Sequence, residues 1–222
     1  MMTNLFSSFD PTTSNNLALN WMSMTIILFI MPSPFWLLPS RLNLMFMFLY
    51  KNIIKETSSI MNKYLLNSNI LFFTIFFIIL VLNFSSLFPM IFPCTSQISL
   101  SLSLALPLWM SMMIFGWTKK YYVMMAHLVP QGTPKILMPF MVCIESISNL
   151  IRPITLSVRL SANMIAGHLL LTLIGSTGSL INSVTLIVLL ITQLMLIILE
   201  SAVSIIQSYV FTILATLYSS EI

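Results

Sequence analysis

Long apolar runs separated by short polar or proline-rich stretches dominate the chain. The runs at 70–88 and 98–117 each have the ~20 residues that a helix needs to cross ~30 Å of hydrocarbon. Residues 17–38 form another such run, which ends among three prolines. The pattern therefore predicts three membrane spans in the first half of the chain.

Two apolar stretches in the second half are too long for an ordinary crossing. Residues 136–174 and 180–218 would each extend ~58 Å if wholly helical, against ~30 Å of hydrocarbon. Bilayer thinning does not absorb a mismatch of that size, so such helices must tilt steeply or bend. Gly175 and Gly178 lie between them and supply a turn. We expect a hairpin of two long, steeply tilted helices.

The segment 41–65 has a different character, because basic residues are spread among its Leu, Met, Phe and Ile. These residues are Arg41, Lys51, Lys55 and Lys63. The pattern favours an amphipathic helix that lies on the membrane surface with its basic side toward the head groups. A solvated loop is the alternative. The expected fold class is thus an all-α integral membrane protein, one membrane domain over 1–222, with about five membrane helices and one amphipathic surface helix.

Composition supports a lipid environment. The chain is 58% hydrophobic and 6% charged, whereas a soluble domain is about 25% charged. Seven of its nine basic residues fall in two groups, 41–63 and 119–135. The positive-inside rule puts both groups on one side of the membrane and the N-terminus on the other. The net charge of +4 therefore reports topology, and no nucleic acid is expected as a partner.

An arginine lies deep in the first hairpin helix. A guanidinium at bilayer depth costs between ~2.5 and ~17 kcal/mol, so Arg159 needs a compensating role. At 100° per residue, Glu145, Arg152 and Asn163 share a sector of ~80° with it, and His168 lies ~180° away. A titratable group on each side of a permanent cation suggests two separate proton routes. A structural arginine that ties two helices together through a buried pair is the alternative.

The second hairpin helix carries a polar stripe. Gln193, Glu200 and Gln207 are spaced by seven, which keeps them on one side with ~20° of drift per heptad. Glu200 in apolar surroundings suits a group that takes and releases protons, and His168 titrates near neutral pH. A relay between these two residues and a simple packing contact both remain open.

Several stretches resemble one known family. The segment LSVRLSANMIAGHLL at 156–170 resembles the arginine helix of ATP synthase subunit a in its mitochondrially encoded form. The opening MMTNLFSSFDP, the loop AHLVPQGTPKILMP and the closing LESAVSIIQSYVFTILATLY are similar to the same family. The resemblance covers most of the chain, and its arginine-centred block is a specific motif.

The resemblance implies a function, a location and partners. It implies a proton-translocating stator subunit with two offset half-channels, which pass protons to and from the carboxylates of a rotating c-ring and couple proton flow to ATP synthesis. The expected partners are the c-ring, other Fo stator subunits and the lipid bilayer. The expected location is the mitochondrial inner membrane, multi-pass, with the N-terminus in the intermembrane space and the C-terminus in the matrix.

The resemblance also implies roles for individual residues. Arg159 matches the arginine that faces the ring carboxylate and separates the half-channels, and Asn163 and Gln207 match polar residues near it. His168 and Glu200 match the polar pair of the half-channel on the intermembrane-space side. Glu145 matches an acid on the matrix route. No role is carried over to Arg152.

Other chemistry is not indicated. The chain has no Gly-rich phosphate loop, no Ser/His/Asp grouping and no Cys/His zinc spacing, so we expect no catalytic site, no cofactor and no metal. An antiporter-like ion carrier subunit of a respiratory complex is the rival function, but it should show acids and lysines on several broken helices. A structural scaffold is a second rival, and it leaves Arg159 and Glu200 without a purpose.

Overall fold

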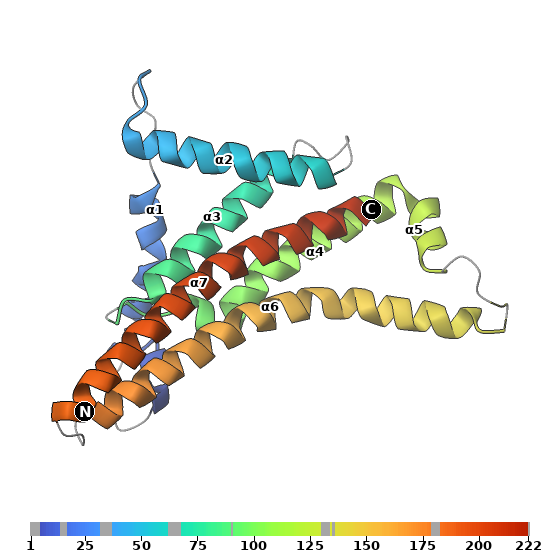
Figure 1. The fold of residues 1–222 in the computed structure, drawn as a ribbon. Helices are drawn as coiled ribbons and strands as arrows, with labels where there is room; N and C mark the ends of the chain where they lie inside the picture. Colours follow the sequence, from blue (N-terminus) through green and yellow to red (C-terminus); the bar gives the residue numbers. More distant parts are fainter. Residues whose placement is uncertain are drawn as a thin grey trace.

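The computed structural model describes residues 5–13, 17–31, 37–61, 68–89, 91–129, 134, 136–178 and 183–221. Helices make up nearly all of this part of the chain (Figure 1). The α-helices are α1 (Ile26–Ile30), α2 (Arg41–Ile60), α3 (Asn69–Ser86), α4 (Ile98–Lys119), α5 (Tyr121–His127), α6 (Met138–Thr177) and α7 (Ser183–Glu221). Short 3-10 helices are η1 (Leu5–Phe9), η2 (Leu19–Thr25) and η4 (Cys94–Ser96).

The first apolar run is helical over Leu19–Ile30, of which the first part is the 3-10 helix η2. Two hydroxyl side chains bond to the backbone within this stretch. Ser23 Oγ donates to the Asn20 carbonyl at 3.0 Å and Thr25 Oγ1 donates to the Met22 carbonyl at 2.6 Å. Such bonds compete with the regular helix ladder. The run was expected to reach residue 38, and residues 32–36 of that range lie outside the described residues.

α2 begins at a side-chain cap and packs on α3 through aromatic rings. Ser40 Oγ accepts a hydrogen bond from the backbone N–H of Asn43 at 3.3 Å, which satisfies one of the free N–H groups of the first turn. Phe46 meets Phe77 edge-on, with ring centroids 4.8 Å apart. A hydrogen bond of 3.1 Å from Tyr209 Oη to Glu56 Oε2 ties α2 to α7 as well.

α3 is the most enclosed helix and forms the centre of the bundle. Its phenylalanines Phe72, Phe73, Phe76 and Phe77 are buried, and it packs against α7, α2 and α1. Ile79 joins α3 to α4, α6 and α7 in one apolar cluster with Ala105, Leu156, Leu160 and Phe211. This helix therefore supports α7 directly, whereas α6 packs mainly against α4 and α7.

α6 and α7 form the long hairpin. They contain 40 and 39 residues, or about 60 Å each at 1.5 Å per residue. The two helices lie together near Thr177 and Ser183, which we call the hairpin end (Figure 1). They diverge toward the other end, where α7 terminates at Glu221 and which we call the C-terminal end (Figure 1).

Small hydroxyl residues line the interior of the hairpin. Ser157 and Ser161 of α6 and Ser204, Ser208 and Thr212 of α7 are all buried. Their hydroxyls donate to carbonyls of their own helices, so each donor is satisfied without a bond between helices. Small side chains of this kind let membrane helices approach closely.

The prediction of an all-α membrane protein is confirmed. Four helices in the described ranges are long and apolar enough to cross a membrane: Asn69–Ser86, Ile98–Lys119, Met138–Thr177 and Thr185–Ser220. A shorter apolar helix covers Leu19–Ile30. The hairpin helices greatly exceed the ~30 Å of a bilayer core, so they cross it only when steeply tilted.

Candidate functional site

Arg159 lies near the middle of α6, on its exposed face. Asn163 is exposed one turn further along, and the small residues Ala162 and Ala166 are exposed beside it. No ion pair found among the described residues includes Arg159. An apolar helix thus presents a charged guanidinium and small neighbours to whatever lies against this face. This arrangement differs from the buried pair that would make Arg159 purely structural.

Gln207 supports the backbone at this position from α7. Its Nε2 donates to the Arg159 carbonyl at 3.3 Å, and its side chain is buried. The bond connects the two hairpin helices at the residue that carries the charge. Gln207 therefore lies near Arg159 and contacts its backbone.

Glu200 is buried against the backbone of α6. Its side chain is 5% exposed, and neither carboxylate oxygen has a hydrogen-bond partner in the described part of the chain. A Cβ added at Gly167 would lie 2.6 Å from Glu200 Cδ, far inside van der Waals contact. The carboxyl group thus occupies the space that the absent side chain of Gly167 leaves open.

His168 lines a cavity of about 460 Å³ at the hairpin end. The cavity walls include Ser8, Asp10, Thr172 and Gln193. His168 Nε2 is buried and has no hydrogen-bond partner among the described residues. His168 and Glu200 are neighbours through Gly167, yet no hydrogen bond joins them here. A cavity of this size, with polar residues in part of its wall, has room for several water molecules at ~30 Å³ each.

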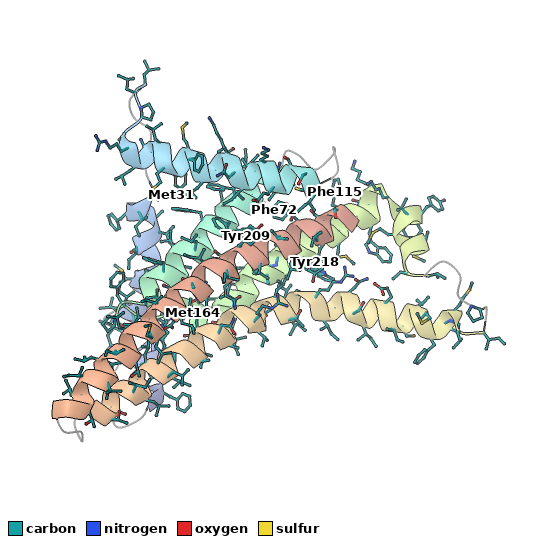
Figure 2. The ribbon with its side chains drawn as sticks, in the orientation of Figure 1. Met31, Phe72, Phe115, Met164, Tyr209 and Tyr218 are labelled. Carbon is teal, nitrogen blue, oxygen red and sulfur yellow. The ribbon has the colours of Figure 1, made fainter. Side chains whose placement is uncertain are left out.

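Glu145 lies at a second cavity, at the C-terminal end, with a volume of about 330 Å³. Its Oε1 lies 3.8 Å from Arg152 Nη2, and both side chains are partly exposed. Arg152 also lies over the ring of Tyr218 from α7, with its guanidinium carbon 4.8 Å from the ring centroid. Figure 2 shows Tyr218 in the space where α6 and α7 have diverged. The cavity is lined further by Trp109, Met112, Met113, Trp117, Met124, Leu128 and Asn149.

The two cavities lie on opposite sides of Arg159 along α6. Arg152 is seven residues before it and His168 is nine residues after it, or about 10 Å and 14 Å along a helix axis. The hairpin-end cavity holds an imidazole and the C-terminal-end cavity holds a carboxylate. The arrangement can therefore supply protons to, and remove them from, two separate places on either side of one cation.

Sequence reasoning missed two polar features of the interior. Asn83 of α3 is fully buried, and neither polar atom of its amide has a partner among the described residues. In the sequence, the feature that could have indicated Asn83 is a polar amide within an otherwise apolar run. The contact of Arg152 with Tyr218 joins residues 66 positions apart in the sequence, and no local pattern indicates it.

Metal-ligating residues do not gather anywhere in the described ranges: no group of three or more His, Cys, Asp or Glu side chains lies close enough to hold an ion. Cys94 is buried and Cys143 is exposed, and both are free thiols.

Comparisons with known proteins agree with this chemistry. The model of the family described as ATP synthase A chain matches residues 17–220. The chain is 55% identical to ATP synthase subunit a of Drosophila melanogaster over 223 residues, which covers 100% of both proteins. It is 54% identical to the proteins of the same description from Locusta migratoria and Anopheles gambiae, again over 100% of each.

Proposed function

The chain belongs to the ATP synthase A chain family, and from that premise we propose that Arg159 is the barrier between its two proton routes. The protein is a proton-translocating stator subunit of the membrane sector of ATP synthase and a multi-pass membrane protein. The antiporter-like alternative is not favoured, because similarity to subunit a extends over the full length. The roles of single residues are the subject of the proposal.

The chemistry of arginine suits a barrier. Its guanidinium stays protonated at any physiological pH, so it cannot accept a proton and pass it on. It still stabilises an ionised carboxylate that comes within ~4–6 Å. The observation that carries the proposal is the exposed position of Arg159 between the two cavities, in no ion pair found among the described residues.

The partner at this face is a carboxylate on the helices of a rotating c-ring. Ala162 and Ala166 beside Arg159 would let a neighbouring helix approach closely. A protonated ring carboxylate that arrives at Arg159 would release its proton toward one cavity and be reprotonated only from the other. Each proton that crosses 100 mV yields ~2.3 kcal/mol, and separated routes direct that energy into rotation. Nucleotide chemistry belongs to other subunits of the complex.

Each cavity belongs to one route in this proposal. His168 and Glu200 serve the route at the hairpin end, and Glu145 serves the route at the C-terminal end. Asn163 and Gln207 keep the surroundings of Arg159 polar. We place the protein in the mitochondrial inner membrane, with the hairpin end toward the intermembrane space and the C-terminal end in the matrix. The basic groups near α2 and α5 support this orientation.

The direct test is Arg159→Ala in the assembled complex. We expect ATP-driven proton pumping into sealed vesicles to be abolished while ATP hydrolysis by the catalytic sector persists. Arg41→Ala, which removes an exposed cation from α2, is the matched control and should leave pumping intact. Normal pumping by Arg159→Ala would remove the assignment.

A cross-link tests the ring partner separately. A cysteine that replaces the exposed Ala166 should form a disulfide with a cysteine on the outer face of a ring helix. Phe48→Cys is the control, because Phe48 is exposed on α2, a helix that packs on α3 and α7. Cross-linking from α2 but not from residue 166 would contradict the placement of the ring.

A further inference from the structure

The N-terminal residues 5–10, which we call the entry segment, form one wall of the hairpin-end cavity. Ser7, Ser8 and Asp10 line that cavity together with His168 of α6. The segment comprises the 3-10 helix η1 and the residue after it, and it packs against α6. Residues more than 150 positions apart in the sequence therefore line the same cavity.

Two side chains from other elements hold the backbone of the entry segment. Gln97 Nε2, at the start of α4, donates to the Phe9 carbonyl at 2.9 Å. Asn20 Nδ2, in η2, donates to the Asp10 carbonyl at 3.2 Å. Both bonds are made to consecutive carbonyls, so they fix the segment at the residue that carries the carboxylate. The entry segment is therefore anchored to η2 and α4 where it lines the cavity.

Phe9 of the entry segment contacts His168 directly. Its ring meets the His168 imidazole edge-on, with ring centroids 6.3 Å apart and planes at 90°. Phe9 and His168 are both half-buried. The aromatic contact restricts the imidazole, whose Nε2 has no partner among the described residues. Water in the cavity is thus the natural partner for that nitrogen.

Asp10 is the charged residue of the cavity lining. The other elements around the cavity contribute neutral groups: Asn20 from η2, Leu171 and Thr172 from α6, Gln193 and Ile197 from α7, and, between α3 and η4, Leu87, Phe88, Pro89, Ile91, Phe92 and Pro93. His168 is the second titratable residue in that lining. An exposed carboxylate in a cleft whose described lining carries no other charged residue raises the local concentration of cations, protons included, and speeds their arrival.

We propose that Asp10 collects protons for the hairpin-end route and passes them to His168. This inference rests on the proposed function of that route. A hydronium ion or a buffer acid gives its proton to the Asp10 carboxylate, and cavity water carries the proton to Nε2 of the neutral imidazole. The carboxylate is regenerated, so each cycle moves one proton and consumes nothing.

The test uses the assembled complex in sealed vesicles, with proton-driven ATP synthesis as the readout. Asp10→Asn should lower the rate about threefold or more at low buffer concentration, because the arrival of protons then limits the rate. The loss should grow as the pH on the entry side rises. A high concentration of a small mobile buffer should restore the rate, and Asp10→Glu should retain it. Thr12→Ala, an exposed change two residues away, should have no effect.

The outcomes separate proton collection from a structural role and from failure of the route itself. An equal loss at every pH and buffer concentration would show that Asp10 only shapes the wall, and an unchanged rate would also overturn the proposal. Glu200→Gln in the same vesicles tests the route. If Glu200→Gln leaves synthesis intact, the proposed function of the cavity fails, whatever Asp10→Asn does.

Discussion

The two ends of the hairpin treat their ionisable residues in opposite ways. At the hairpin end, Glu200 is buried and His168 is half-buried, and their side-chain polar atoms Oε1, Oε2 and Nε2 have no partner among the described residues. At the C-terminal end, Glu145 and Arg152 are partly exposed and lie 3.8 Å apart as an ion pair. Among the described residues, the hairpin end therefore holds polar atoms without hydrogen-bond partners, and the C-terminal end holds two opposite charges that form an ion pair.

This difference indicates at which end substitutions should impair proton transport most. A buried charged or polar group without a partner costs several kcal/mol, so Glu200 and His168 need water or a proton. Exposed ion pairs contribute ~0–1 kcal/mol, so the C-terminal end gains little from its pair. We expect substitutions at the hairpin end to have large effects on proton transport and substitutions at the C-terminal end to have small ones.

The largest effect is expected for Glu200→Gln. The amide has the same shape but cannot take up and release a proton, so proton-driven ATP synthesis should fall by about two orders of magnitude, as for loss of a group that transfers protons. The rate in vesicles that contain the assembled complex is the measurement. Glu56→Gln, a change to an exposed carboxylate on α2, is the control. A synthesis rate for Glu200→Gln equal to that for Glu56→Gln would contradict a special role in proton transfer for the carboxyl group at the hairpin end.

A smaller but clear effect is expected for Gly167→Ala. The added Cβ would lie 2.6 Å from Glu200 Cδ, so the carboxyl group must move away from α6. We expect the synthesis rate to fall about tenfold, since small displacements at a reacting group are costly. Gly175→Ala is the matched control on the same helix, because its Cβ would meet only Gln193 Nε2 at 3.7 Å. A similar loss in both variants would mean that the space beside Gly167 has no special role.

The smallest effect is expected for Tyr218→Leu. This change removes the ring under Arg152, a cation–π contact worth ~0.5–1 kcal/mol, so the synthesis rate should fall by no more than about fivefold. Tyr218→Phe keeps the ring and should match the unmodified protein. A complete loss of synthesis in Tyr218→Leu would show that the C-terminal end is as sensitive as the hairpin end.

Much of the architecture is predictable from the sequence, because membrane helices are long and need only apolar runs. The expected stretches 136–174 and 180–218 correspond to α6 at Met138–Thr177 and α7 at Ser183–Glu221. Gly178, one of the two expected turn residues, is the residue that follows α6. The 3-10 start of the first apolar helix was not predictable from hydropathy, since an apolar run does not distinguish a 3-10 helix from an α-helix.

Sequence reasoning named candidate residues for the site but not their contacts. Helical periodicity puts Arg159 and His168 on opposite sides of α6, and the structure has one exposed and the other at a cavity. The same periodicity does not predict that the Glu200 carboxyl lies beside Gly167. Nor does it predict that Phe9 contacts His168 or that Asp10 lines the same cavity. These contacts join distant segments, and only the packing of the helices determines them.

The central claim is that the two cavities open to water on opposite sides of the membrane. Thiol labelling from each side of the membrane tests it most directly. In a chain whose two native cysteines are replaced by alanine, Thr172→Cys labels the hairpin-end cavity and Asn149→Cys labels the C-terminal-end cavity. A membrane-impermeant thiol reagent is added to one side of sealed vesicles at a time. We predict that each cysteine reacts from one side only and that the two sides are opposite. Reaction of either cysteine from both sides, or of both from the same side, would contradict two routes separated by Arg159.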